Sequence, residues 1–311
     1  MHALAPYGGS DQVQLAYDAA GLATDRPARV IRVDRISCVV ATPDGDRIAT
    51  ATDLPAVGDW VTLDGDADRP TIAAVVPRRS TLTRHDADRE RVQVIAANVD
   101  LVLICAPGDR PSASRVEREC VLAWESGATP VVILTKADAV PEGYVEELQE
   151  RIQGVEVVTT AVVEQRGVAE VAALLAPNRT AVMLGPSGAG KSTLANALLG
   201  EEHFATGEVR EDDRRGRHTT SSRALVVIPS GGVLIDTPGI RTLGLGDVDE
   251  GLDATFTDIV ELVAACKFSD CSHSREPGCA VRAAVAAGEL DSARLANFLR
   301  LEAEVTATPR G

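Results

Sequence analysis

The spacing of hydrophobic positions changes twice along the chain and divides it into three parts. Up to about residue 80, short runs rich in β-branched residues are separated by turn-forming sequences such as Pro-Asp-Gly and Asp-Gly. Strands of this length and spacing are typical of a small all-β barrel. The runs are residues 29–42, 47–52, 59–63 and 70–76.

From about residue 81 to residue 246, continuous apolar runs alternate with amphipathic stretches. Continuous runs are typical of parallel strands that are covered on both faces. Residues 115–127 and 142–153 have the periodicity of helices. We therefore expect an α/β domain here, with strands at residues 99–106, 129–135, 155–160, 180–185 and 231–237.

Beyond residue 246 the strand signals stop, and two helix-like stretches, residues 255–266 and 280–305, flank a group of cysteines and one histidine. Three thiolates and one imidazole at this spacing form a closed tetrahedral set, which predicts one structural Zn²⁺ ion. The alternative is a chance grouping of reduced cysteines. The predicted ligands are Cys266, Cys271, His273 and Cys279.

Composition narrows the class of protein. The 311 residues are 45% hydrophobic and 25% charged, as in ordinary globular proteins of two or three domains. No apolar run approaches the roughly 18 residues of a membrane span, and the start lacks the layout of a signal peptide, so we expect a cytoplasmic protein that does not enter membranes.

The net charge of −15 argues against non-specific nucleic-acid binding by the whole surface. Arginine-bearing stretches could still form local basic faces at residues 26–35, 77–84 and 210–217.

A phosphate-loop motif follows the apolar run at residues 180–184. Glycines in such a loop let backbone N–H groups turn onto phosphate oxygens, and the following helix adds positive potential. Lys191 is predicted to contact the β- and γ-phosphates, and the Ser192 hydroxyl to bind Mg²⁺. The motif comprises Gly185, Pro186, Ser187, Gly188, Ala189, Gly190, Lys191, Ser192 and Thr193.

Two further segments fit the same site. Asp236 ends an apolar run and is followed by Thr-Pro-Gly, so its carboxylate could hold a water on Mg²⁺ while the Gly239 N–H bonds the γ-phosphate. Between this segment and the phosphate loop, the polar stretch Arg-His-Thr-Thr places Thr219 and Thr220 where either could reach Mg²⁺. Each segment alone is also compatible with an ordinary turn or a solvated loop.

A base-reading motif precedes the phosphate loop. Thr135, Lys136 and Asp138 follow an apolar strand and match the [Asn/Thr]-Lys-x-Asp pattern, in which the aspartate accepts hydrogen bonds from guanine N1–H and its 2-amino group. Adenine would leave that carboxylate unpaired, and such polar readout can discriminate by about 10⁴ or more. Thr160 and Ala161, after the next strand, are candidates for a partner loop that touches the base.

The order of these motifs is unusual, because the base-reading motif comes first, the phosphate loop second and the Mg²⁺ aspartate last. With a barrel before them and a Cys/His cluster after them, the chain resembles the circularly permuted GTPases of the RsgA (YjeQ) family. The sequences that carry the resemblance are LPAVGDWV, QVIAANVDLVLI, GPSGAGKSTLANAL, RHTT, LIDTPGIR and CKFSDCSHSREPGC.

The resemblance implies an α/β fold: a circularly permuted Ras-like GTPase domain at residues 81–246, an N-terminal OB-fold barrel at 1–80 and a C-terminal helical zinc-binding domain at 247–311. It also implies GTP hydrolysis to GDP with Mg²⁺, stimulated by the small ribosomal subunit late in its assembly, and contact with rRNA. A monomer is expected. We further hypothesise that the nucleotide state changes the angle between the barrel and the zinc-binding domain.

Two positions depart from common patterns. Thr135 stands where asparagine is more usual in the family, and Ile240 follows the Asp-Thr-Pro-Gly sequence where many Ras-like enzymes have the glutamine that orients water. The resemblance implies that His218 takes the role of this glutamine, although packing or rRNA binding would also explain that histidine. A P-loop ATPase or kinase, and a GTP-gated RNA-binding scaffold without hydrolysis, remain alternatives for the whole chain.

Overall fold

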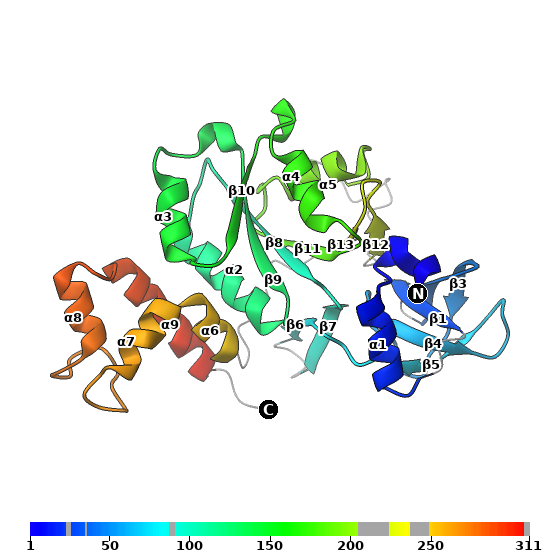
Figure 1. Cartoon of the computed structure of the whole chain (residues 1–311), viewed down its shortest axis with the longest axis horizontal. Helices are drawn as coiled ribbons and strands as arrows, with labels where there is room; N and C mark the ends of the chain where they lie inside the picture. The colour runs from blue at the N-terminus through cyan, green and yellow to red at the C-terminus, as the bar shows by residue number, and fades with distance from the viewer. Residues whose placement is uncertain (23–25, 35, 87–90, 205–223, 237–248, 308–311) are drawn as a thin grey trace.

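A computed structural model of the chain shows three parts in a row, with the N-terminal barrel and the C-terminal helices on opposite sides of a central α/β domain (Figure 1). The N-terminal barrel comprises strands β1–β5, the central domain strands β6–β13 with helices α2–α5, and the C-terminal helical domain helices α6–α9. The domain boundaries expected near residues 80 and 246 stay predictions. The structure describes residues 1–22, 26–34, 36–86, 91–204, 224–236 and 249–307.

The barrel follows the predicted alternation of strands and turns. Its strands pair antiparallel, and β1 pairs with both β2 and β4. Alternate side chains such as Val30, Val40 and Val61 point inward and are fully buried. The strands are β1 (Pro27–Val33), β2 (Cys38–Thr42), β3 (Gly45–Ala49), β4 (Trp60–Asp64) and β5 (Thr71–Val75).

Two short helices before the barrel were not predicted from the strand pattern. They are a 3₁₀ helix η1 (His2–Tyr7) and helix α1 (Asp11–Ala19). The Ser10 hydroxyl caps α1 by accepting a hydrogen bond from the Val13 amide, as is usual at a helix start. Tyr17 is fully buried. Its hydroxyl donates to the Val61 carbonyl of β4 at 2.7 Å, which fastens the helix to the barrel.

In the central domain, neighbouring strands run in the order β10, β9, β8, β11, β13, β12. The first five are parallel, whereas β12 pairs antiparallel with β13 and continues through β1 into the barrel. The strands are β8 (Leu101–Pro107), β9 (Thr129–Thr135), β10 (Glu156–Thr160), β11 (Thr180–Leu184), β12 (Ala224–Val227) and β13 (Val233–Asp236).

Helices cover both faces of this sheet, which explains the continuous apolar runs. In β8, Val102 and Ile104 pack on the side of α2 and α3, while Leu103 and Cys105 pack on the side of α4 and α5. All of these side chains are fully buried. The helices are α2 (Ala113–Glu125), α3 (Tyr144–Arg151), α4 (Val168–Leu175) and α5 (Lys191–Leu199), with short 3₁₀ turns η2 (Ala137–Ala139) and η3 (Val162–Glu164).

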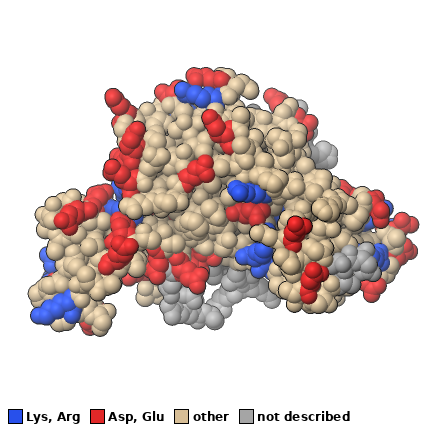
Figure 2. Space-filling view, in the orientation of Figure 1, with Lys and Arg blue, Asp and Glu red and all other residues tan. Residues whose placement is uncertain are grey.

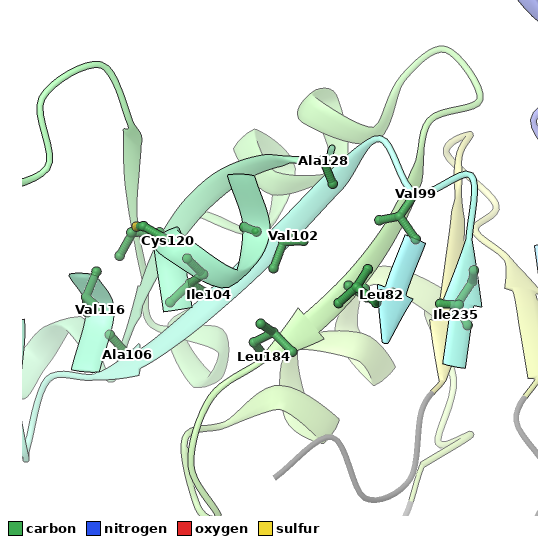
Figure 3. Packing of buried hydrophobic residues seen from close by; sticks show 14 of the residues in the cluster. Leu82, Val99, Val102, Ile104, Ala106, Val116, Cys120, Ala128, Leu184 and Ile235 are labelled. Atoms are coloured by element: carbon green, nitrogen blue, oxygen red, sulfur yellow. The ribbon is translucent and has the colours of Figure 1, made fainter. Parts of the chain in front are cut away.

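An antiparallel hairpin, β6 (Thr81–Asp86) and β7 (Arg91–Ala97), forms a separate sheet between the barrel and β8. Leu82 packs with Val99, Leu184 and Ile235 in the core on the α2 side of the main sheet (Figure 3). The hairpin therefore extends the apolar cover of the main sheet.

A buried arginine joins the barrel to the central domain. The Arg29 guanidinium, fully buried and 4.9 Å from the Trp60 ring, donates to the Thr180 hydroxyl at 2.9 Å and to the Asn98 carbonyl at 3.3 Å. It also bonds the carbonyls of Tyr7 and Gly58. Burial lowers the pKa of Arg29 to about 10, so it stays charged at neutral pH and depends on these acceptors.

The C-terminal domain is helical, as predicted, but the stretch expected as one helix over 280–305 forms two. Gly288 adopts a left-handed φ of 78° and ends the first, and the second begins at Ser292. None of the described helices is long and apolar enough to cross a membrane. The helices are α6 (Asp249–Thr255), α7 (Thr257–Ala264), α8 (Ala280–Ala287) and α9 (Ser292–Ala307).

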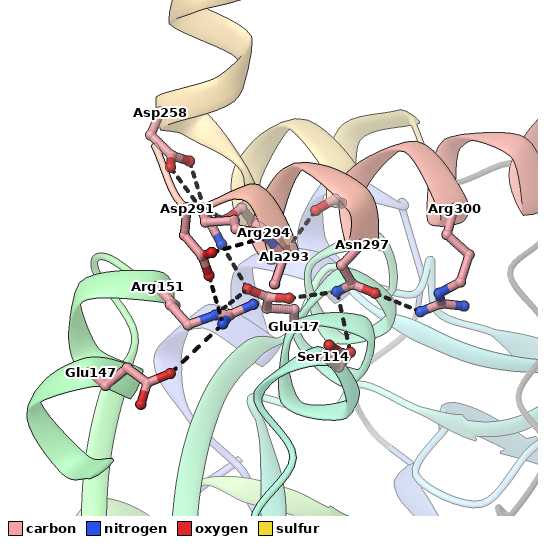
Figure 4. Close-up of polar contacts among 12 residues, drawn as sticks. Ser114, Glu117, Glu147, Arg151, Asp258, Asp291, Ala293, Arg294, Asn297 and Arg300 are labelled. Carbon is pink, nitrogen blue, oxygen red and sulfur yellow. Dashed lines mark hydrogen bonds and ion pairs between the residues drawn. The ribbon is translucent and has the colours of Figure 1, made fainter. Parts of the chain in front are cut away.

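A buried carboxylate fastens the C-terminal domain to the central domain (Figure 4). Glu117 of α2 has no exposed side-chain surface, and its Oε1 accepts from Arg151 at 2.9 Å and from Arg294 at 3.0 Å. Its Oε2 accepts from Asn297. Arg294 also pairs with Asp258 at 2.6 Å. One residue of α2 thus links α3, α7 and α9 through paired, hydrogen-bonded charges.

We expect Glu117→Ala to lower the free energy of unfolding by about 3–5 kcal/mol, because it leaves Arg151 and Arg294 buried without their shared carboxylate. Urea unfolding followed by tryptophan fluorescence measures this, because Trp124, one of the two tryptophans, lies two turns further along α2.

Glu304→Ala is the matched control. Glu304 of α9 pairs with Arg118 of α2, the helix that also carries Glu117. The side chains of Glu304 and Arg118 are 36% and 27% exposed. Such partly exposed pairs contribute about 0–1 kcal/mol. Equal decreases in the free energy of unfolding of the two variants would show that the buried Glu117 cluster stabilises the protein no more than an exposed ion pair does.

Candidate nucleotide and zinc sites

The described parts of the predicted nucleotide-binding segments lie at one edge of the central sheet. Because β9, β8, β11 and β13 are adjacent and parallel, their carboxyl ends lie at the same edge of the sheet. The base-reading motif begins with the last residue of β9, and the phosphate loop follows β11. Asp236 is the last residue of β13. Neighbouring strands therefore bring together segments that lie about one hundred residues apart in the chain.

Tight packing requires glycine at the start of the phosphate loop. Gly185 has a φ of 132°, and a Cβ atom there would lie 2.4 Å from the Cys105 carbonyl oxygen of β8. Gly190 has a φ of 81° and precedes the first residue of α5. The loop is thus pressed onto β8 and opens directly into a helix N-terminus, whose free N–H groups favour an anion.

Lys191 and Ser192 begin helix α5 at the end of this loop. The Lys191 ammonium donates to the carbonyls of Gly185 and Pro186, both at 2.7 Å. Lys191 and Ser192 line one side of a hollow of about 470 Å³ that includes open solvent. Its other walls are Met183, Ala195, Phe204, Leu234 and Ile235. A flexible ammonium and a hydroxyl thus border an accessible space at the helix start.

A hydrogen bond joins the base-reading motif to the phosphate loop. The buried Thr135 hydroxyl donates to the Ala189 carbonyl at 2.8 Å, across 54 positions of sequence. A Cβ atom at Gly190 would lie 3.5 Å from the Thr135 Cβ. The Thr135 side chain therefore connects the base-reading motif to the phosphate loop.

The rest of the base-reading motif forms a turn after β9. Lys136 adopts a left-handed φ of 54°, and its ammonium donates to Asp109 Oδ2 at 2.7 Å. This hydrogen bond is the main reason that the pKa of Asp109 lies below its ordinary value. Asp138 lies in η2 with its residue exposed to solvent, where a ligand can reach the carboxylate.

The predicted partner loop follows β10. Thr160 is fully buried, and its hydroxyl has no hydrogen-bond partner among the residues that the structure describes. The Ala161 and Arg166 backbones bond each other in both directions, at 3.1 and 3.2 Å. A Cβ atom at Gly167 would lie 2.1 Å from the Thr159 carbonyl, so this compact turn requires glycine there. The turn lies beside the base-reading motif because β10 pairs with β9.

Some predicted residues lie outside the described part of the chain. These are His218, Thr219, Thr220 and Gly239. For Asp236 the structure describes the backbone, which ends β13 at the same edge as the phosphate loop.

Residues near the site that the motifs did not predict come from the loop after β8 and from helix α2. Asp109 and Arg110 lie in the loop after β8, and Glu119 lies on α2. Burial raises the pKa of Glu119 to about 7, opposed by the positive charges of Arg115 and Lys191. The loop after β8 could have been predicted to lie near the site, because a loop that follows a parallel strand of such a sheet begins at its carboxyl edge.

The zinc ligands predicted from the sequence meet in the C-terminal domain. Ligand atoms of Cys266, Cys271, His273 and Cys279 all lie within 4.8 Å of one another. His273 Nδ1 lies 3.6 Å from the Cys266 sulfur and 3.5 Å from the Cys279 sulfur, and these two sulfurs are 3.9 Å apart. Zn–S and Zn–N bonds of ordinary length give tetrahedral edges of about 3.8 Å and about 3.6 Å. The donor set therefore fits one Zn²⁺ ion.

The backbone conformation and hydrogen bonds around this cluster hold the four ligand residues in place. His273 has a left-handed φ of 57° and is 6% exposed. The Cys279 sulfur caps α8 by accepting from the Arg282 amide. Glu276 accepts hydrogen bonds from the Ser272 hydroxyl and two backbone amides, which lowers its pKa to about 2. An ionised carboxylate thus orders the loop between the ligands.

Comparisons with known proteins agree with this arrangement. Residues 75–246 match the model of the RsgA GTPase family. The small ribosomal subunit biogenesis GTPase RsgA of Streptomyces avermitilis is 43% identical, covering 96% of this chain and 85% of the relative. The protein of the same name from Xanthomonas axonopodis pv. citri is also 43% identical, covering 90% of this chain and 80% of the relative.

Solved structures share the fold. YjeQ from Thermotoga maritima superposes with a TM-score of 0.69 at 25% identity, covering 91% of this chain and 99% of that one. YloQ, described as a circularly permuted GTPase, gives a TM-score of 0.67 at 24% identity, covering 93% and 98%. From the matched sequence and this shared permuted fold, we conclude that the chain belongs to the RsgA GTPase family.

Proposed function

We propose that this protein hydrolyses GTP at the carboxyl edge of its central sheet and acts in the biogenesis of the small ribosomal subunit. The observation that supports the enzymatic part is the hydrogen bond from the Thr135 hydroxyl to the Ala189 carbonyl, which joins the base-reading motif to the phosphate loop. The biological role is taken from relatives that are 43% identical over nearly the whole chain and are named for it.

In this proposal the phosphate loop encloses the phosphate chain of GTP. Lys191, which already reaches two loop carbonyls, would exchange them for phosphate oxygens. The Ser192 hydroxyl and the Asp236 carboxylate would hold Mg²⁺, with Thr219 or Thr220 completing the site. When bound, Mg²⁺ neutralises charge that develops on the phosphates. Ser187, Gly188 and Thr193 are exposed, which suits residues that line the entrance to the pocket.

The guanine base would lie between the turn after β9 and the turn after β10. Asp138 would accept hydrogen bonds from guanine N1–H and the 2-amino group, while the backbone near Thr160 and Ala161 would meet the other edge. Asp109 holds the Lys136 ammonium beside the turn after β9, so Lys136 would form a wall of the base site.

Hydrolysis requires a group that orients water, and Ile240 offers none at the position that follows Asp-Thr-Pro-Gly. We propose that His218 supplies it, as the family resemblance implies. We expect the intrinsic rate to be low, which is consistent with stimulation by the ribosomal subunit.

Contact with rRNA would depend on local surfaces. The face in Figure 2 carries acidic groups over the central and C-terminal domains, with few basic groups between them. The whole chain has a charge of −15. We therefore propose that the barrel and the zinc-binding domain meet rRNA elsewhere, through shape and backbone contacts. We also propose a cytoplasmic monomer.

GTP turnover should be slow alone and rise at least tenfold with purified small ribosomal subunits. The Lys191→Ala variant should lose this activity, because no other described lysine lies in the loop. Phosphate release measured with and without subunits tests the proposal. Turnover that persists in Lys191→Ala would contradict the assigned site, and the absence of any subunit effect would contradict the proposed role.

The variant Asp138→Asn should change base preference from guanine to xanthine, because the amide donates where the carboxylate accepted. We expect the affinity for GTP to fall by about two orders of magnitude or more. Competition binding with GTP, ATP and xanthosine triphosphate measures it. An unchanged preference, or tight ATP binding by the wild type, would favour an ATPase or kinase.

One zinc ion per chain should be present, and Cys266→Ser should remove it. Structural zinc contributes on the order of 10 kcal/mol to folding of small sites. We therefore expect rapid proteolysis within α7–α8 of the variant. Cys38→Ser is the control, because Cys38 is a buried cysteine of the barrel. A full complement of zinc in Cys266→Ser would contradict the ligand set.

A further inference from the structure

The loop between β8 and α2, residues 108–112, lies beside the proposed pocket, and its backbone is fixed by the base-reading motif. The Gly108 amide donates to the Thr135 carbonyl at 2.8 Å. A Cβ atom at Gly108 would lie 2.7 Å from the Lys136 carbonyl oxygen. The Arg110 amide in turn donates to the Pro107 carbonyl at 3.1 Å. The loop is therefore held against β9 at a separation that only glycine allows.

A carboxylate in this loop lies between two cations. Asp109 Oδ2 accepts from the Lys136 ammonium at 2.7 Å, and Oδ1 lies 3.9 Å from Arg110 Nε. The hydrogen bond from Lys136 holds the pKa of Asp109 below its ordinary value, so the carboxylate is ionised at neutral pH. Asp109 can therefore orient the arginine that follows it while it binds the lysine of the base-reading motif.

The arginine side chain extends from this loop to the phosphate loop. Arg110 Nη2 lies 3.3 Å from the position that a Cβ atom would occupy at Gly188. Gly188 has a φ of 74°, and its exposed backbone forms the middle of the phosphate loop. The Arg110 side chain is 65% exposed and, among the described residues, its ion pair is the 3.9 Å contact with Asp109. Guanidinium donors thus remain available to a ligand on the loop.

We propose that Arg110 is a phosphate ligand of the bound guanine nucleotide, supplied by the loop after β8. This inference rests on the proposed function, because Gly188 belongs to the loop that would enclose the phosphates. A guanidinium presents planar donors that match phosphate oxygens, and it stays charged at any physiological pH. Arg110 would add a second cation to Lys191 at the phosphate chain, in a protein whose net charge is −15.

The test measures the binding of N-methylanthraniloyl-labelled GDP and GTP to the full-length protein. Arg110→Ala should raise both dissociation constants about tenfold, which corresponds to about 1.4 kcal/mol. Faster nucleotide dissociation in stopped-flow measurements should account for most of the change. Arg110→Lys keeps the charge but loses the planar fork, so its affinity should fall between those of the wild type and Arg110→Ala.

Arg69→Ala is the matched control, because it removes the same charge from an exposed position between β4 and β5 of the barrel. It should bind both nucleotides like the wild type. The thermal unfolding temperature of Arg110→Ala should also equal that of the wild type, since the side chain is mostly exposed.

The outcomes of this experiment separate a failure of the role of Arg110 from a failure of the proposed function. If Arg110→Ala binds like Arg69→Ala while Lys191→Ala loses binding, the role of Arg110 is overturned and the proposed function stands. If Arg110→Ala unfolds several degrees lower, the arginine is structural and the inference is also overturned. If the wild type binds neither labelled nucleotide, the proposed function and this inference fall together.

Discussion

Parallel pairing of β9, β8, β11 and β13 is the constraint on which the rest of the molecule depends. It delivers the segments after these strands to one edge, whatever their order in the chain. A permuted sequence can therefore build the same pocket as an unpermuted one, because strand adjacency and not chain order sets which loops meet. The Thr135–Ala189 hydrogen bond and the close approach of Gly185 to Cys105 are local consequences of that adjacency.

Buried charges at both junctions attach the outer domains to this sheet. Arg29 reaches from β1 to Thr180 at the start of the strand that leads to the phosphate loop. Glu117 gathers Arg151 and Arg294 at the opposite junction. Because an unpaired buried charge costs several kcal/mol, each junction is stable only in the one geometry that satisfies its charge. The polar contacts thus specify how the domains are placed, while apolar packing supplies most of the cohesion.

The features predicted correctly from the sequence are those that depend on the spacing of residues along the chain. Apolar runs located the parallel strands, and the spacing of Cys266, Cys271, His273 and Cys279 located a cluster that the structure confirms. Contacts between segments that carry no motif could not be predicted. In the sequence, Glu117 looks like an ordinary helix glutamate and Arg110 like an ordinary loop residue, because only the fold shows which residues they contact. The N-terminal helices were missed because their short apolar pattern gains its stability from the barrel, as the bond from Tyr17 to Val61 illustrates.

The same contacts bear on how a nucleotide could act on the zinc-binding domain. Residues 237–248 connect β13 to α6, and α6 is docked on α2: the Gly251 amide bonds Glu125 at 3.0 Å, and a Cβ atom at Gly251 would lie 2.3 Å from the Val121 carbonyl. A rotation of the domain would break this contact and the Glu117 cluster together. If that costs about 3–5 kcal/mol, GTP would have to prefer the rotated form roughly 10²- to 10⁴-fold, because a ligand shifts an equilibrium only by its differential affinity. A ribosomal subunit that contacts both outer domains would therefore be the better source of that free energy, and the nucleotide would select between states that the subunit had already made accessible.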